Sequence, residues 1–522
     1  MTMKNILRNI IVGGMVASML VSCDLNLNPT TDIVYEEGTA LFQKAQDVAD
    51  FQIGVLASYR SLFAGSYTLS SEVMADGFNA TLGFGNNYGS VHRADYSFTP
   101  SDSYVENLWG AHYLAMKNFN IAIASAEEVA DDADFKANAD ILNAIARYCR
   151  ANSYLTLARH FGNAYDPATA ATDLCVPLVL VYDQFELPAR ATVQEVYNQI
   201  YTDLAIAEEI FVAAAEAGAS IEVSGVKYKL AGQVRAQVPT LDAVRALLAR
   251  YYLDIQDYGS AIDAAESVIG SAAGYRLAAT AEEMANEYTN DLGNEPVVQL
   301  YASKKEGAVA RTLFTGVTKY NDQKVFSAYF VPSANLVNAY SASDLRYTTW
   351  FSSTTYPLFS SGNLYNDVQI FTKFIDNPNL NPDNIEAGLH SAKPIQIGEM
   401  YLIAAEAYAM DGNTAAATQM LNALKAARKA GSVTGDIMEE IKMEWFRETA
   451  GEGMRLNCLK RWGDGIAARK PQAKAASVVM TGESYTERVV EAGSHIFNWP
   501  VPTREIKINK NLVQNDGYGS EE

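Results

Sequence analysis

Two stretches of the chain, ARYYLDIQDYGSAI at residues 249–262 and AAEAYAMDGNTAA at residues 404–416, share one arrangement. In each, small residues and a tyrosine close a helical stretch, a polar turn follows, and alanine opens the next helix. Small residues let two helices pack closely, and the turn reverses the chain. The pattern predicts helix pairs of the tetratricopeptide-like kind, although a generic helix bundle would also fit it.

Other helices are predicted from apolar residues at helical spacing. A helix that begins near Ser101 or Ser103 has a stripe of Trp109, Tyr113 and Met116 at spacings of four and three. The copies of the pair do not recur at a period of about 34 residues, so we expect one mainly α scaffold with insertions and no simple solenoid. The expected helices cover residues 41–63, 139–161, 239–256, 260–269, 399–410 and 414–429.

The region 280–392 differs from the rest of the chain. It is rich in serine, asparagine and tyrosine and has few runs at helical spacing. Long irregular segments in a compact protein are usually functional or disordered, and the aromatic content argues against disorder. We therefore expect a loop-rich, irregular ligand-binding portion there. The predicted organisation is a leader at 1–22, a helical region at 23–279, the loop-rich region at 280–392 and a helical region at 393–522.

The first 23 residues predict export and lipid attachment. Lys4 and Arg8 precede an apolar stretch that ends in Leu20-Val-Ser-Cys23 and is too short to span a bilayer comfortably. A basic start, an apolar run and small residues before the cut are typical of a bacterial secretion signal. Cysteine directly after the cut resembles a lipobox, where diacylglycerol is attached to the thiol. We expect lipidation at Cys23, with a plain signal peptide as the alternative.

Charge and cysteine content narrow the function classes. The 522 residues are 49% hydrophobic and carry a net charge of −21, with a pI near 4.7. Proteins that bind nucleic acid need a stripe of basic residues on their surface. We therefore expect this acidic protein not to bind nucleic acid. After Cys23, the cysteines are Cys149, Cys175 and Cys458. Three is an odd number, so either Cys149 pairs with Cys175 or all three are buried free thiols.

Catalytic and metal motifs with convincing spacing do not occur in the sequence. It has no Gly-x-Ser-x-Gly, no His-Glu-x-x-His and no Walker loop. The five histidines do not pair at ligand spacing, so we expect no metal and no cofactor. Residues 377–383 have the rhythm of a calcium loop, but Pro382 stands where the turn glycine belongs, which favours a surface loop. A glycosidase needs two carboxylates, and 61 acidic residues leave that alternative open.

Four ordered motifs in the carboxyl-terminal third resemble the RagB/SusD family of outer-membrane nutrient-binding lipoproteins. Trp445 stands where this family usually has arginine, Cys458 where it usually has aspartate, and residues 163–176 are inserted. The charged side chains of the third motif can pair at helical spacing, which favours a structural role for them. The motifs are PIQIGEMYLIAAEA at 394–407, NALKAARKAG at 422–431, EWFRETAGEGMRLNCLKRWG at 444–463, and WPVPTREI at 499–506 with QNDGY at 514–518.

The resemblance implies where a ligand binds. Binding residues of such proteins commonly lie in loops before the first long helix and in the irregular middle. Sugar rings stack their C–H faces on aromatic rings, and amides and acids bond the hydroxyls. The packing of Phe84 and Trp350 against the helices is an equally compatible reading. The candidate residues are Asp76, Asn79, Phe84, Asn86, Asn87 and Tyr88 in the first region, and Trp350, Tyr356 and Tyr365 in the second.

The resemblance also implies the function. We expect a lipid-anchored protein on the exterior of a bacterial outer membrane that captures a nutrient without chemical reaction. The ligand is expected to be an oligosaccharide or polysaccharide, with peptide as the alternative, and the partner a TonB-dependent SusC-like barrel. Two other classes stay open from the residues alone. They are a lipid-anchored glycan-degrading enzyme and a helical-repeat scaffold of envelope assembly.

Overall fold

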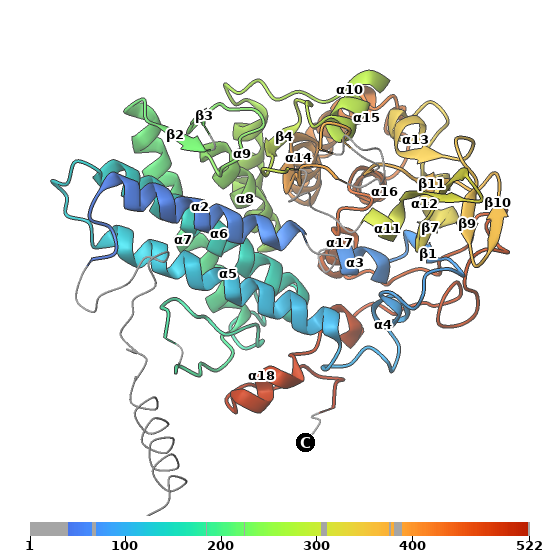
Figure 1. Ribbon diagram of the computed structural model, residues 1–522, viewed down its shortest axis with the longest axis horizontal. Helices are drawn as coiled ribbons and strands as arrows, with labels where there is room; N and C mark the ends of the chain where they lie inside the picture. Colours follow the sequence, from blue (N-terminus) through green and yellow to red (C-terminus); the bar gives the residue numbers. More distant parts are fainter. Residues whose placement is uncertain are drawn as a thin grey trace, which may run out of the picture.

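The computed structural model describes residues 40–64, 69–183, 185–223, 225–303, 311–374, 377–380 and 389–519. The predicted leader and Cys23 lie outside these residues. One side of the molecule is a stack of helices, and each helix packs on the next (Figure 1). The stack consists of α2 (Ala45–Ala64), α5 (Ser103–Glu127), α6 (Lys136–Phe161), α7 (Val193–Glu216), α8 (Leu241–Asp254), α9 (Tyr258–Ile269), α14 (Ile397–Met410) and α15 (Thr414–Ala427).

The chain leaves this stack after α9 and returns to it at α14. These two helices pack against each other although the region 280–392 separates them in sequence. The excursion and most of the remaining segments build the other side of the molecule (Figure 1). The helices outside the stack are α3 (Ser70–Met74), α4 (Gly89–Arg93), α10 (Ala281–Thr289), α11 (Arg311–Phe314), α12 (Ala334–Ala339), α13 (Leu345–Trp350), α16 (Ile437–Glu448), α17 (Arg455–Trp462), the 3-10 turn η2 (His495–Phe497) and α18 (Thr503–Ile508), which lies below α5 in Figure 1.

Short strands accompany these helices. In the largest sheet the strand order is β10-β9-β6-β5, with β6 and β9 parallel and the other neighbours antiparallel. The remaining strands form two-stranded pairs: β1 with β7, β2 with β3, β4 with β12 and β8 with β11. The strands are β1 (Phe78–Ala80), β2 (Ser220–Val223), β3 (Val226–Lys229), β4 (Pro296–Val298), β5 (Val317–Tyr320), β6 (Gln323–Phe326), β7 (Phe330–Pro332), β8 (Phe351–Ser352), β9 (Leu358–Ser360), β10 (Asn363–Tyr365), β11 (Ile370–Phe371) and β12 (Ile395–Gln396).

The mainly α fold and the predicted helices are confirmed, with ends shifted by a few residues. One long helix, α7, was not predicted, although Thr192 and Glu195 form a capping box at its start. The region 280–392 also contains more regular structure than expected. Its strands have only two to four residues, too few for an alternating pattern to stand out.

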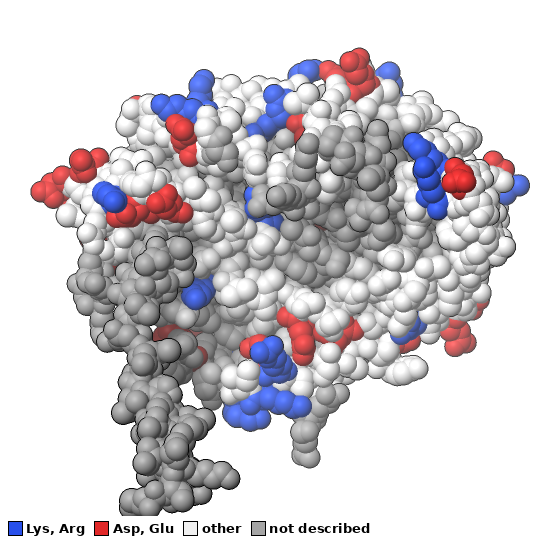
Figure 2. All heavy atoms as spheres, viewed as in Figure 1, with Lys and Arg blue, Asp and Glu red and all other residues white. Residues whose placement is uncertain are grey.

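Cys149, Cys175 and Cys458 are buried and free, so the alternative without a bridge is confirmed for these three residues. Among the described helices, none combines the length and apolarity that crossing a bilayer requires. On the face shown in Figure 2, charged side chains form small clusters, many of which hold acidic and basic groups side by side, and wide uncharged areas separate the clusters.

Candidate functional site

The structure brings together parts of the two predicted ligand regions. The backbone N–H of Gly83 donates to the Ser360 hydroxyl at 2.9 Å, and the N–H of Leu82 donates to the Val478 carbonyl at 2.8 Å. The loop 82–88 therefore adjoins the β9–β10 hairpin, although some 277 positions separate them in sequence. We call the surface formed by residues 82–88 and 352–365 the loop–sheet face.

Four predicted ligand residues on this face have solvent-accessible side chains. Asn86 is exposed and has a left-handed backbone, with φ of 62°, while Asn87 is half-buried. Tyr356 and Tyr365 are half-buried against the small core beneath the sheet, and Tyr356 meets the Phe326 ring edge-on at 5.4 Å. Their contact with a ligand stays a prediction. The arrangement can offer two aromatic surfaces and two amides to a polar ligand.

Asp76 and Asn79 are occupied by contacts within the protein. The Asp76 carboxylate accepts from Arg455 at 2.9 and 3.0 Å and is 4% exposed. The Asn79 amide donates to the Lys470 carbonyl at 3.4 Å and is 1% exposed. A ligand contact of either residue also stays a prediction, and it would require these groups to give up or share buried bonds.

The aromatic candidates Phe84, Tyr88 and Trp350 are core residues in this structure. Tyr88 stacks on Tyr104 with ring centroids 4.2 Å apart, and Phe84 is 6% exposed. Trp350 lies apart from Tyr356 and Tyr365 in the interior, where the Lys373 ammonium is 3.9 Å from its ring centroid. For Phe84 and Trp350, these contacts correspond to the alternative in which the two rings pack against the helices. They leave the three rings little surface to offer a ligand.

The charged residues of the third motif have structural partners. The carboxylate of Glu448 pairs with Arg428 at 2.5 Å and with Arg346 at 2.7 Å. Arg346 also pairs with Glu444, and Arg428 with Glu295. Burial opposes the charged form of Glu448, yet the two arginines hold its pKa below the usual range. This buried network joins α13, α15, α16 and the segment before β4, so these side chains support the fold.

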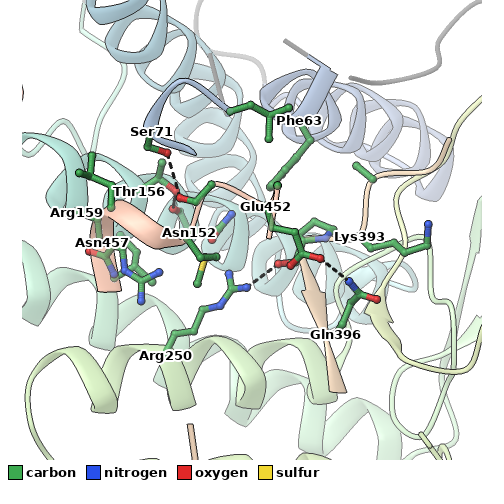
Figure 3. A pocket seen from close by; sticks show the side chains of 18 of the residues that line it. Phe63, Ser71, Asn152, Thr156, Arg159, Arg250, Lys393, Gln396, Glu452 and Asn457 are labelled. Atoms are coloured by element: carbon green, nitrogen blue, oxygen red, sulfur yellow. Dashed lines mark hydrogen bonds between the residues drawn. The ribbon is translucent and has the colours of Figure 1, made fainter. Parts of the chain in front are cut away.

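A cavity of about 190 Å³ lies between the helix stack and two carboxyl-terminal segments (Figure 3). Helices α5, α6 and α8 contribute one wall, and residues 390–396 and 451–457 contribute the other. The Gln396 amide donates to the Glu452 carboxylate at 3.2 Å, and Ser71 donates to the Gly453 carbonyl at 3.1 Å. The site thus sits where the two halves of the chain meet.

Sequence reasoning missed this cavity. The motifs 394–407 and 444–463 indicated the family, and neither Gln396 nor Arg250 was predicted to bind a ligand. Arg250 donates to the Pro394 carbonyl at 2.7 Å, a contact across 144 positions. Polar residues inside otherwise apolar helices, such as Arg250 in α8, were the available signal, because buried charges need partners.

Metal binding finds no support among the described residues. In the described ranges, no group of three or more His, Cys, Asp and Glu side chains is placed to hold a metal ion. In the calcium-like stretch, the Asn377 amide donates to the Asp291 carboxylate at 2.7 Å. The positions from 381 to 388 of that stretch lie outside the described residues.

Comparison with known proteins identifies the family. The family model described as "SusD family" matches residues 249–518, and the model described as "Starch-binding associating with outer membrane" matches residues 36–253. The first match covers more than half of the chain. The chain therefore belongs to the SusD family. No curated protein matches the chain.

Solved structures share the fold at low sequence identity. A SusD superfamily protein from Bacteroides thetaiotaomicron has a TM-score of 0.72 and 23% identity, covering 90% of this chain and 99% of that one. A laminarin-binding SusD-like protein has a TM-score of 0.68 and 19% identity, covering 91% and 100%. The surface glycan-binding protein A from Bacteroides fluxus has a TM-score of 0.65 and 18% identity, covering 90% and 99%.

Proposed function

We propose that the protein is an outer-membrane lipoprotein that binds an oligosaccharide or polysaccharide and delivers it to a TonB-dependent SusC-like transporter. The observation that carries this proposal is the pair of family matches, which together run from residue 36 to residue 518. Structural neighbours named for laminarin and glycan binding support the ligand class. Capture and delivery require no bond cleavage, so the protein acts as a binder and not as an enzyme.

We place the glycan on the loop–sheet face. The rings of Tyr356 and Tyr365 are partly open to solvent, and apolar sugar faces stack on such rings. The amides of Asn86 and Asn87 lie on the adjoining loop. The Asn86 oxygen accepts from Arg93 at 3.1 Å and the Asn87 nitrogen donates to the Phe84 carbonyl at 3.0 Å, which leaves the Asn86 NH₂ group and the Asn87 oxygen to bond hydroxyls. The Gly83–Ser360 contact holds the loop against the hairpin. A fixed spacing between rings and amides is what selective binding of a sugar chain needs.

Calorimetric titration with soluble glycans tests this site. Laminarin, soluble starch, xylan and a mixed peptide digest would be titrated into the full mature chain. We expect one glycan to bind and the substitutions Tyr356→Ala and Tyr365→Ala to weaken it roughly tenfold each, or about 1.4 kcal/mol. Phe185→Ala is the matched control, because Phe185 is an aromatic residue 81% exposed on another segment. Unchanged affinity in both tyrosine variants would refute the site, and binding of peptides alone would refute the ligand class.

The anchor and the delivery step have separate tests. Mass spectrometry of the protein from its native membrane is expected to show a diacylglyceryl group on Cys23, and Cys23→Ser to release the protein from the membrane. Co-purification in mild detergent is expected to yield a stoichiometric TonB-dependent barrel. Envelope-assembly factors in its place would favour a scaffold. Incubation with the bound glycan is expected to release no shorter products, and product release would favour an enzyme.

A further inference from the structure

We propose that the cavity between the helix stack and residues 390–396 and 451–457 is a second binding site, which accepts one uncharged sugar ring or a polyol of that size. This inference rests on the cavity lining and concerns a place distinct from the loop–sheet face. It therefore stands or falls separately from the proposed function. Four features of the lining support this inference: the size of the cavity, its paired charges, its neutral histidines and its aromatic side chains.

The size fits one ring. The cavity volume of about 190 Å³ holds roughly a dozen water-sized groups, which is the scale of a sugar ring with its hydroxyls. The walls come from parts of the chain that the buried core fixes in place, including Leu108 of α5 and Leu456 of α17. A preformed cavity spares a small ligand the cost of ordering its site.

The charge of the lining favours an uncharged ligand. Every lysine, arginine and acidic side chain among the described lining residues already has a partner of opposite charge. A charged ligand would bury a charge without a free counterion, which costs considerable free energy. The pairs are Arg250 with Glu399 at 2.5 Å, Lys393 with Asp291 at 2.6 Å, Glu452 with Lys373 at 2.7 Å, and Arg159 with Asp254 at 2.7 Å.

Two histidines of the lining are neutral and one has an unmet hydrogen-bonding group. Burial lowers the pKa of His112 to about 3 and that of His160 to about 4. The His112 side chain is 3% exposed, and its Nδ1 has no hydrogen-bond partner in the part of the chain that the structure describes. Because this Nδ1 is inaccessible to a water-sized group, it offers no ligand contact, and the two neutral imidazoles contribute an uncharged part of the cavity wall.

The remaining wall provides an apolar surface. Phe374 and His390 both line the cavity, and their rings stack on each other with centroids 5.0 Å apart and an angle of 17° between their planes. Phe63 also faces the cavity (Figure 3). Polar groups of the lining come from Gln396 and Asn457. The Gln396 amide nitrogen already donates to the Tyr288 hydroxyl at 2.7 Å and to Glu452 at 3.2 Å, so Gln396 has its amide oxygen left for a ligand. A molecule with apolar C–H faces and a rim of hydroxyls, such as a neutral hexose, matches both kinds of wall.

The test compares neutral and charged versions of one ring. D-glucose, D-galactose, D-mannose, D-xylose and myo-inositol would be titrated calorimetrically into the full mature chain, beside glucuronate and glucosamine at pH 7. We expect saturable binding of at least one neutral compound and at least tenfold weaker binding of the charged analogues. Failure of every neutral compound to bind a folded protein would overturn the inference, and so would equal affinity for glucuronate.

Variants locate the site. Leu108→Trp fills the cavity and Gln396→Leu removes an amide at nearly constant size, and each is expected to reduce monosaccharide affinity at least tenfold. Phe185→Ala, at an aromatic residue that is 81% exposed and belongs to neither site, is the control and should leave monosaccharide affinity unchanged. Gln396→Leu is the second variant because the bulky Leu108→Trp substitution can disturb folding, which circular dichroism checks. Retained affinity in folded Gln396→Leu and Leu108→Trp protein would overturn the inference even if polysaccharide binding to the loop–sheet face were confirmed.

Discussion

Arg455 donates two parallel hydrogen bonds to the Asp76 carboxylate, from Nε to Oδ1 at 2.9 Å and from Nη2 to Oδ2 at 3.0 Å. The two residues are 379 positions apart in sequence. The pair ties the start of the predicted ligand loop to the third family motif, at the beginning of α17. A bidentate arginine–carboxylate contact is both strong and directional. The Asp76 carboxylate therefore helps to stabilise the fold.

Removal of the Asp76 charge should destabilise the protein. Because Asp76 is 4% exposed, Asp76→Asn leaves the Arg455 guanidinium partly buried without its counterion. We expect the free energy of unfolding to fall by about 3–5 kcal/mol, measured by urea denaturation. The exposed Asp263→Asn is the control and should change it by less than about 0.5 kcal/mol. Full stability combined with lost glycan affinity would instead make Asp76 a ligand residue.

A methyl group at position 83 should disturb the loop–sheet face. A Cβ there would lie 2.9 Å from the Ser360 hydroxyl and 3.3 Å from the Ser361 nitrogen, so either the Ser360 hydroxyl must turn away and lose its bond to Gly83, or the loop and the hairpin must move apart. We expect Gly83→Ala to lower glycan affinity roughly three- to tenfold, about 0.7–1.4 kcal/mol, by calorimetry. Gly110→Ala in α5 has open space around the new methyl group and should leave affinity unchanged. Equal glycan affinity of the Gly83→Ala and Gly110→Ala variants would show that the Gly83–Ser360 contact does not contribute to glycan binding.

The stability of the protein should depend on pH through Glu287. Burial, and then the neighbouring charge of Glu295, raise the pKa of the Glu287 carboxyl above its usual value. The native state thus binds this proton more tightly than the unfolded state, whose glutamates have a pKa of about 4.3. Stability is therefore lost as the pH rises from that value through the raised pKa.

Glu287→Gln should remove this loss, because an amide does not ionise. Between pH 5 and pH 8 the variant is expected to lose less free energy of unfolding than the parent, by on the order of 1–3 kcal/mol in urea titrations. The exposed Glu209→Gln should keep the parental pH dependence. The same slope in Glu287→Gln and in the parent would contradict the assignment.

The capping box of α7 should contribute measurably to stability. The Thr192 hydroxyl accepts from the Glu195 N–H at 3.2 Å, and the Glu195 carboxylate accepts from the Thr192 N–H at 2.8 Å. Thr192→Ala removes the first of these bonds and should cost about 1 kcal/mol in urea unfolding. Thr202→Ala, on the same helix, is the control because Thr202 only bonds back to the carbonyl of Asn198. Alanine has the higher helix propensity, so a cost as large in Thr202→Ala would show that loss of a threonine side chain as such, and not loss of the cap, is responsible.

The helical scaffold was readable from the sequence because local periodicity encodes it. The stripe of Trp109, Met116 and Ile123 buries one face of α5 as expected. Helix α7 was not predicted, although its start is also encoded locally, by the capping box of Thr192 and Glu195. The strands of the sheet β10-β9-β6-β5 are too short to produce a pattern of their own.

The sites were less readable because they depend on contacts between distant segments. The sequence placed Tyr356 and Asn87 in separate candidate regions, and only the folded chain shows that a 277-position contact at Gly83 joins those regions. The cavity is harder to predict from the sequence, because its walls come from helices of the stack and from the distant segment 390–396. Nothing local to Gln396 indicates that it faces a cavity.

The three buried thiols determine how the chain can be produced. Burial raises the pKa of Cys175 to about 12 and that of Cys458 to about 11, so these thiols do not ionise near neutral pH. A thiol in this state is a poor nucleophile for oxidation or exchange. The native fold of the described residues therefore requires no thiol oxidase or disulfide isomerase. Mature polypeptide made in a reducing cytosol is expected to reach the same fold as polypeptide that has been exported.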